Sequence, residues 1–180
     1  MFSLIDKNIQ AYCDEHTSME SEEMAKQVTK YNKLIFMVGF WVDPIFFRIG
    51  KSSFLNSFFS TIYIRLEKSK WGSKYPIIMN DLYQGTIKKE KMCDALIELE
   101  ALKKHLTKFS PKDVVWDFED LNALPPSENK ISSDITDLSN YFVTIDGNNL
   151  LDVLEKAMNA SIEIEEDLII RYLDYMSLIE

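Results

Sequence analysis

The sequence predicts an α+β fold, in which a small, mostly antiparallel sheet of about four strands packs with several helices and the termini are rich in helix. Four short segments rich in β-branched and aromatic residues provide the strands, and apolar residues at helical spacing fill the segments between them. The chain has 180 residues, of which 46% are hydrophobic, and this composition suits one domain with a sizeable core.

The first 32 residues predict a helical extension. Over residues 2–16 the apolar side chains recur at helical spacing, and Thr17 or Ser18 could cap a second helix that ends near Tyr31. Three glutamates fall in the first turn of this second helix, where negative charge suits the helix dipole.

Residues 34–42, LIFMVGFWV, lack a helical period and predict a buried strand. Asp43-Pro44 is a turn signal, and PIFFRIG predicts a second strand that forms a hairpin with the first. A helix is expected from Ser52 or Ser53, because apolar residues then recur every four positions. These residues are Phe54, Phe58, Ile62 and Leu66.

A loop and two further helices are expected next. Residues 68–75 predict the loop, and a short helix over residues 76–83 uses Pro76 at its first position, where the missing N–H is harmless. Apolar residues at helical spacing then predict a long helix over residues 87–109.

The stretch VVWDFEDLNALPP begins at Val114, and its first five residues predict a third strand. Alternation would place Val115, Asp117 and Glu119 on one face of that strand. The Pro-Pro pair prevents regular pairing, so we expect a loop of about twenty residues that ends at Asn140. Loops of this length in compact domains are usually functional or cover something.

Residues 140–146, NYFVTID, predict a fourth strand, and Asp146-Gly147 predicts a turn. The remainder from Asn148 predicts helix, with a break near residues 159–161. An apolar stripe on this helix is either a core face or a dimer seam, and we favour the core face because solitary surface helices rarely carry such a stripe. The stripe comprises Ile164, Leu168, Tyr172, Tyr175 and Ile179.

Negative charge is concentrated towards the end of the chain. Residues 111–180 contain 4 Lys or Arg and 16 Asp or Glu, a net charge of −12, whereas residues 1–110 carry a net charge of +3. Such a field repels nucleic acid and anionic membranes and attracts basic partners. The alternative is a solvated acidic face that keeps the protein soluble.

Cys13 and Cys93 form no CxxC pair, which favours a reduced, cytoplasmic compartment. The first residues contain neither a basic segment nor a long apolar run, so we expect no signal peptide. The longest apolar runs in the chain are too short to span a bilayer.

Nucleotide and metal sites are not expected. RIGKSSF resembles the end of a P-loop, but Ile45 occupies the position of the required first glycine. His16 and His105 lack an HExxH arrangement or a cysteine at ligand spacing, so neither zinc nor another cofactor is predicted. Spacing alone leaves a Cys–His nucleophilic pair open, although nothing marks either cysteine as activated.

Asp117 and Glu119 are the one candidate pair for acid chemistry, since two carboxylates on one sheet face could hold Mg²⁺ or divide acid and base roles. No His, Lys or Arg stands near them in sequence to complete a catalytic site. We therefore favour an acidic face that meets solvent or a partner, with no catalytic residue and no metal ligand.

The chain contains, in this order, the stretches MVGFWVDPIFFRIG, SSFLNSFFSTIYIRLE, WGSKYPIIMNDLYQG, LEALKKHL, VVWDFEDLNALPP, DITDLSNYFVTIDG and NLLDVLEKAM. Together they resemble the immunity protein 70 family of bacterial polymorphic toxin systems. The resemblance covers residues 33–158 within one domain of residues 1–180. It leaves residues 1–32 and 159–180 as N-terminal and C-terminal helical extensions.

The resemblance implies a cytoplasmic, non-enzymatic protein that is made beside a secreted or contact-delivered toxin, often of the LXG type. Such a protein binds the cognate toxin domain and blocks it, without a cofactor, a nucleic acid or a membrane; a homodimer is left open. Two other classes also stay open. One is a metal-dependent enzyme built on Asp117 and Glu119, and the other is a general interaction module whose acidic C-terminal helix docks on a basic protein.

Toxin contacts are expected on two aromatic residues and five carboxylates, above all in the loop from Leu121 to Asn140. The candidates are Trp71, Tyr75, Asp117, Glu119, Asp120, Asp134 and Asp137. Many toxin domains act on nucleic acid and are basic, so an acidic surface would imitate the charge of their substrate and speed encounter. For Trp71 and Trp116 we favour a core position, and Asp134 and Asp137 have the alternative of capping a turn.

Overall fold

The computed structural model describes residues 37–126 and 131–172. In chain order the elements are β1 (Met37–Val42), β2 (Ile45–Lys51), α3 (Ser52–Thr61), η1 (Ile62–Leu66), η2 (Ile77–Leu82), β3 (Thr86–Ile87), η3 (Lys89–Lys91), α4 (Met92–Leu106), η4 (Pro111–Asp113), α5 (Leu150–Ile164) and β4 (Leu168–Tyr172). The helices predicted over residues 2–16 and 17–31 lie outside the described residues. Among the helices just named, none has both the length and the apolar character needed to cross a membrane.

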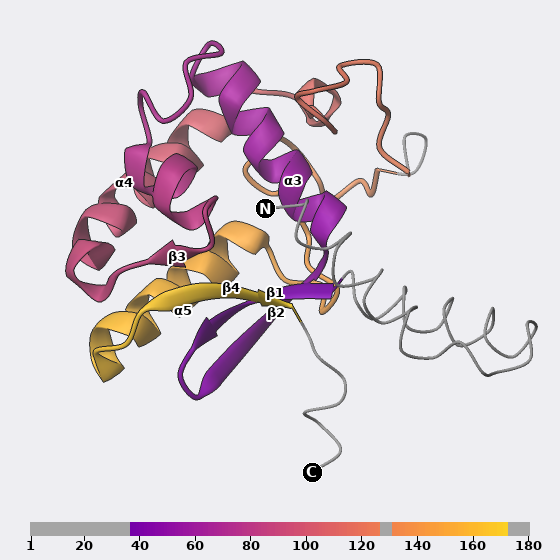
Figure 1. Ribbon diagram of the computed structural model, residues 1–180. Helices are drawn as coiled ribbons and strands as arrows, with labels where there is room; N and C mark the ends of the chain where they lie inside the picture. The colour runs from indigo at the N-terminus through magenta and orange to yellow at the C-terminus, as the bar shows by residue number, and fades with distance from the viewer. Residues whose placement is uncertain (1–36, 127–130, 173–180) are drawn as a thin grey trace, which may run out of the picture. The chain divides into compact units, whose positions relative to one another are not determined.

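The strands form a four-stranded antiparallel sheet in the order β2-β1-β4-β3, which confirms the predicted α+β class (Figure 1). The predicted hairpin is confirmed as well, since β1 and β2 pair across Asp43-Pro44 with Val42 opposite Ile45. Their close packing requires a glycine at position 39, because a Cβ on Gly39 would lie 2.5 Å from the carbonyl oxygen of Phe47.

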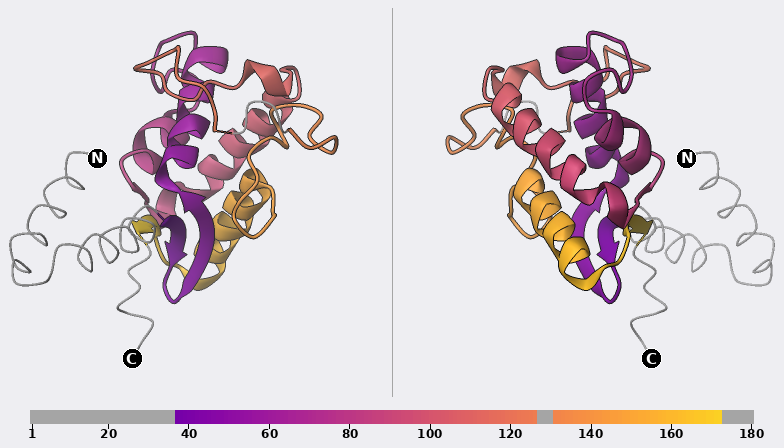
Figure 2. Two further views of the ribbon diagram at one scale, coloured as in Figure 1. Left: turned by 90° about the vertical axis from the view of Figure 1, so that its right-hand side faces the viewer. Right: turned by 90° about the vertical axis from the view of Figure 1, so that its left-hand side faces the viewer.

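One face of the sheet belongs to the core. Val38, Phe40 and Val42 alternate along β1, and each is at most 2% exposed. Helix α5 packs against β1, β2 and β4, and helix α4 lies beside α5 (Figure 2). The sheet, α5 and α4 therefore share one apolar interior.

The long helix predicted over residues 87–109 begins later than expected. Helix α4 starts at Met92, because Thr86 and Ile87 form β3 and pair with Ile169 and Leu168 of β4. A strand of two residues is too short to show an alternating pattern. The helical pattern of the residues that follow was therefore continued too far towards the N-terminus, into β3.

The predicted C-terminal helix is correct only as far as Ile164. Asn149 caps α5 by accepting a hydrogen bond from the N–H of Leu151 at 2.9 Å, and the helix continues through residues 159–161 without the predicted break. Glu165 then adopts a left-handed conformation (φ 56°) that ends the helix.

The strand β4 follows where more helix was predicted. Of the three members of the predicted helical stripe that the structure describes, Leu168 alone is buried, and it pairs within the sheet. Spacing of four residues is compatible with both a helix face and one face of a strand, and LIIRY is rich in β-branched residues. The last two members of the stripe, Tyr175 and Ile179, lie outside the described residues.

Residues 114–118 and 140–146 are not strands of the sheet, so two of the four strands predicted are wrong and β3 and β4 take their places. In the second segment the N–H of Thr144 bonds the carbonyl of Asn148, at 2.8 Å, so the chain turns back on itself. One hydrogen bond, from Ile145 N–H to the Ile49 carbonyl, reaches the edge of β2. The turn predicted at Asp146-Gly147 is confirmed.

Glu67 organises the predicted loop over residues 68–75 from the inside. Its side chain is almost fully buried, and its carboxylate accepts the N–H groups of Gly72, Lys74 and Tyr75 at 2.6, 3.1 and 3.1 Å. A buried charge is costly unless donors replace water, and three backbone N–H groups do so here. The carboxylate therefore determines the path of the loop.

Replacing Glu67 with Gln should lower the free energy of unfolding by about 1–3 kcal/mol, because the new amide NH₂ faces backbone N–H groups and leaves at least one of them without an acceptor. Urea unfolding measures the change. Glu100→Gln, on the exposed side of α4, is the matched control and should leave the midpoint unchanged. Equal midpoints for both variants would contradict this role of Glu67.

A second carboxylate caps the short helix predicted over residues 76–83, which forms as η2. Glu98 of α4 accepts the N–H groups of Ile77 and Ile78 at 3.0–3.1 Å. Burial raises the pKa of Glu98 above its ordinary value of 4.5, and the two backbone hydrogen bonds only partly oppose this shift.

Because the native state binds the Glu98 proton more tightly than the unfolded chain does, stability should fall as the pH rises from 4.5 through the raised pKa. Glu98→Gln has no such titration. We expect the free energy of unfolding of the wild type, relative to that of Glu98→Gln, to decrease between pH 4.5 and neutral pH. Urea unfolding of both proteins between pH 4.5 and neutral pH measures this difference in the free energy of unfolding. A difference that stays constant or increases with pH would show that the pKa of Glu98 is not raised.

Candidate protein-binding surface

Hydroxyl groups on one face of α3 hold residues 115–118 in place. Thr61 Oγ1 accepts the N–H of Val115 at 3.0 Å, and Ser57 Oγ donates to the carbonyl of Val115 at 2.9 Å. Ser60 Oγ accepts the N–H of Phe118 at 3.1 Å. All three hydroxyl residues are fully buried. A helix thus satisfies the backbone groups that a neighbouring strand would otherwise bond, which is why the predicted strand over residues 114–118 is wrong.

Aromatic side chains pack Phe118 of this segment against the residues around η1 and η2. The ring of Trp71 lies 5.2 Å from Tyr63, 4.6 Å from Tyr83 and 5.5 Å from Phe118, measured between ring centroids. Its indole N–H donates to the carbonyl of Met79 at 2.8 Å. Trp71 is half-buried and packed against the core, the position that we favoured for it.

Tyr75, the second aromatic candidate for toxin contact, lies inside the protein. It is 1% exposed, and its hydroxyl lies 2.7 Å from His105 Nδ1. Burial, and then the charges of Glu67 and Glu98, raise the pKa of Tyr75 to about 12. Burial, and then nearby lysines, lower the pKa of His105, whose Nδ1 shares this hydrogen bond with the hydroxyl. Tyr75 is therefore not available to a partner while the fold is intact.

The carboxylates that follow Trp116 stand on a tight turn. Asp117 Oδ1 accepts the N–H of Glu119 at 2.9 Å, and Asp120 Oδ1 accepts the N–H of Asn122 at 3.0 Å. Glu119 and Asp120 are exposed, and Asp117 is half-buried. Burial, and then the charges of Glu119 and Asp117, raise the pKa of Tyr83 above its ordinary value. These contacts replace the shared strand face that we had expected for Asp117 and Glu119.

Asp134 and Asp137 belong to the later part of the loop. Asp137 accepts hydrogen bonds from the N–H of Ser139 at 2.8 Å and from the hydroxyl of Thr136 at 3.0 Å. Burial acts to raise the pKa of Asp137, but hydrogen bonds from Ser139 and Thr136 outweigh it and hold the pKa below its ordinary value. Asp137 thus caps a local turn, whereas the carboxylate of Asp134 is exposed.

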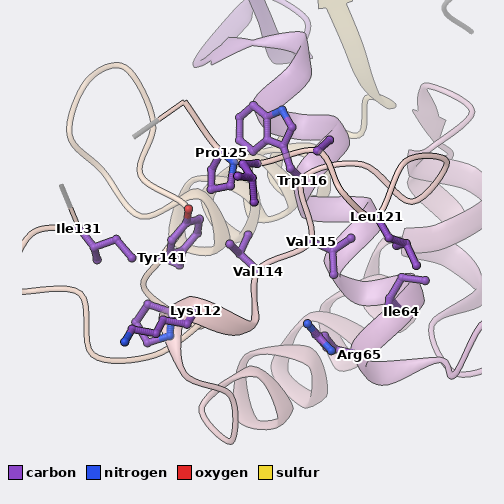
Figure 3. Close-up of a pocket in the computed structure, with 13 residues that line it drawn as sticks. Ile64, Arg65, Lys112, Val114, Val115, Trp116, Leu121, Pro125, Ile131 and Tyr141 are labelled. Atoms are coloured by element: carbon purple, nitrogen blue, oxygen red, sulfur yellow. The ribbon is translucent and has the colours of Figure 1, made fainter. Parts of the chain in front are cut away.

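An apolar groove of about 480 Å³ adjoins these turns (Figure 3). Its lining comes from η1, from residues 111–116 and 121–125, and from Ile131 and Tyr141. Figure 3 shows Arg65 and Lys112 on one side of the groove, with Trp116 and Pro125 on the opposite side. We call the groove, together with Asp117, Glu119, Asp120, Asp134 and Asp137, the loop surface.

The carboxylates of the loop surface have no ion-pair partner within residues 37–126 and 131–172. In contrast, the acidic residues on α5 nearest to α4, Asp152 and Glu155, both bond Lys103. In the same described ranges, no group of three or more His, Cys, Asp or Glu residues could hold a metal ion. The arrangement is suited to binding a positively charged partner.

Sequence reasoning missed the walls of the groove. Leu121, Leu124, Ile131 and Tyr141 were not candidates, although Leu121 and Leu124 stand in the expected loop next to the Pro-Pro pair. The available signal was bulky apolar residues in a segment that no helix or strand could bury. Trp116, for which we favoured a core position, is half-buried and lines the groove.

The model of one family, immunity protein 70, matches residues 40–170 of the chain. No similar curated protein and no similar solved structure was found. The matched residues include the loop surface and extend past residue 158 into β4, in keeping with the place of β4 inside the sheet.

Replacing Thr61 with Val should destabilise the support of the loop surface. The change keeps the shape of the side chain but leaves the buried N–H of Val115 without its acceptor, at a cost of about 1–3 kcal/mol. Urea unfolding measures that cost, and hydrogen exchange at the Val115 amide should become faster. Thr107→Val is the control, because its exposed hydroxyl only bonds Lys104 at the end of α4. Unchanged exchange at Val115 would contradict the role of Thr61.

Proposed function

Because the chain belongs to the immunity protein 70 family and is therefore an immunity protein directed against a toxin, we propose that it binds its cognate toxin domain directly and blocks it by steric and electrostatic means. The loop surface is the part of the protein that makes the contact. The observation that carries this assignment is that five carboxylates, which alternate along the chain with the segments lining an apolar groove, have no ion-pair partner within the described residues.

The charge of the loop surface supports binding to a basic toxin domain. Of the contact residues expected from sequence, the five carboxylates all lie on this surface, whereas Tyr75 is buried and Trp71 serves packing. Residues 111–180 carry a net charge of −12. Complementary charge accelerates encounter and excludes wrong partners more than it adds affinity. A toxin that acts on nucleic acid would meet here a surface with the charge of its substrate.

Other parts of the proposal follow from the family. The protein would act in the cytoplasm, without catalysis, on a toxin domain carried by a polymorphic toxin of the LXG type. Residues 1–180 would form one domain in which the matched region makes the contact. A homodimer is compatible with this arrangement, as long as the loop surface stays accessible.

A growth assay tests the function. The toxic domain encoded beside this gene is expressed in a sensitive host with and without this protein, and complex formation is followed by co-purification. Rescue together with a complex establishes immunity by direct binding. A well-expressed, folded protein that gives neither rescue nor a complex refutes the assignment for that pair. The metal-dependent enzyme and the general interaction module would then be the hypotheses to test.

Neutralising the first carboxylate turn should slow association with the toxin domain. Asn and Gln keep the hydrogen-bond acceptors of the turns, so the triple variant Asp117→Asn, Glu119→Gln and Asp120→Asn removes charge without removing the fold. We expect the association rate at low salt to fall by about tenfold and its salt dependence to weaken. Surface plasmon resonance at two salt concentrations measures both.

The control for this variant carries the same loss of charge on α4 and η3. It combines Glu90→Gln, Asp94→Asn and Glu100→Gln, all at exposed positions. An equal loss in both variants would assign the effect to net charge alone. No loss in either variant would remove the carboxylate turn from the interface.

A further inference from the structure

Three apolar side chains in the walls of the groove are not buried by the fold itself. Leu121 and Leu124 are 66% and 62% exposed, and Ile131 is 37% exposed. None of the three packs against the core cluster, whereas Val114 and Tyr141 in the same groove do. Exposed leucines give up the stability that burial would supply, so their gathering around one depression indicates that another surface covers them.

The floor of the groove is held before any partner arrives. Val115 is fixed by hydrogen bonds to Ser57 and Thr61 of α3, and the ring of Tyr141 packs on Phe142 at a centroid distance of 5.2 Å. A preformed floor reduces the entropy lost when a ligand binds. The volume, about 480 Å³, also falls in the range of roughly 300–1,000 Å³ that is usual for ligand pockets.

One side of the groove carries positive charge, although the surrounding turns are acidic. Arg65 and Lys112 line this side, and neither has a carboxylate within 4.0 Å in residues 37–126 and 131–172. The Nε–H of Arg65 donates to the carbonyl of Asp113 at 2.7 Å, which positions the guanidinium group. The groove therefore offers an apolar depression with a fixed cation at its edge.

We propose that the groove receives a bulky apolar side chain of the toxin domain, next to which the toxin presents a carboxylate to Arg65 and Lys112. Basic groups on the same face of the toxin then meet the carboxylate turn from Asp117 to Asp120. This inference rests on the proposed function and identifies the chemistry of the partner. It matches the usual arrangement of tight interfaces, in which a buried apolar anchor is surrounded by a polar rim.

The apolar part of the inference is tested with Leu121→Ser and Leu124→Ser, measured for binding to the purified toxin domain encoded by the adjacent gene. Each should weaken binding by at least about thirtyfold, chiefly through faster dissociation. Ile97→Ser is the matched control, since Ile97 of α4 is 69% exposed and does not line the groove. All three positions are exposed, so the variants should unfold at the wild-type urea concentration.

The charged part is tested with Lys112→Gln, with Lys104→Gln on α4 as its control. The side chain of Lys112 makes no hydrogen bond or ion pair to another described residue, so its loss should leave stability unchanged and weaken toxin binding by about tenfold. Wild-type affinity in Lys112→Gln would overturn the carboxylate assigned to the toxin.

The outcomes separate this inference from the proposed function. If the wild-type protein does not bind the toxin domain, immunity by direct binding fails. If the wild type binds and rescues growth while both leucine variants bind as tightly as Ile97→Ser, then the groove is not the anchor site and the proposed function stands. A loss of binding confined to the groove variants supports the inference.

Discussion

The loop surface depends on three buried hydroxyl groups of α3. Ser57, Ser60 and Thr61 lie on the inner side of that helix and bond backbone groups of residues 115–118. Without these partners the buried N–H groups would have to find acceptors in a strand or in water. With these hydrogen bonds, residues 115–118 follow a defined path although they have no regular structure. The carboxylate turn and the groove-lining residues that come next in the chain therefore begin at a fixed position on α3. A stable helix thus positions a segment that has no regular structure of its own.

Carboxylates have two separate tasks in this protein. Glu67 accepts backbone N–H groups of the segment between η1 and η2, and Glu98 accepts those of the first two residues of η2, so their charge is used to hold the chain. Glu119 and Asp120 are exposed and Asp117 is half-buried, and the turns that Asp117 and Asp120 form need only one oxygen of each side chain. The second oxygen stays available to a partner. Burial and bonding therefore separate the acids that hold the backbone from those that remain open to a partner, a distinction that net charge alone does not make.

The sequence was sufficient for the hairpin, for α3 and for the short helix η2. The hairpin has two β-branched and aromatic segments around Asp43-Pro44, α3 has an apolar residue at every fourth position, and η2 has Pro76 at its start. The sequence was insufficient for residues 114–118, whose β-branched and aromatic side chains satisfy strand propensity while the hydroxyls of α3 satisfy the backbone. Tertiary contacts outweighed propensity there. For β4, a spacing of four residues fits both structures, and only pairing with β1 decides between them. Among the candidate contact residues, the acids could be proposed because charge is visible in composition, whereas the groove forms only where separate segments of the chain meet in space.

In the proposed complex, the two components of the loop surface would act on different steps of binding. Long-range attraction between the carboxylates and a basic toxin domain raises the rate of encounter but is weakened by salt and adds little to the lifetime of the complex. Burial of Leu121 and Leu124 acts only at contact, is insensitive to salt and slows dissociation. An inhibitor of a lethal protein needs both, because the toxin must be captured before it reaches its target and must then stay bound. An apolar groove and a carboxylate turn that are neighbours along the chain would meet both requirements, and the hydroxyls of α3 fix residues 115–118, from which the carboxylate turn starts.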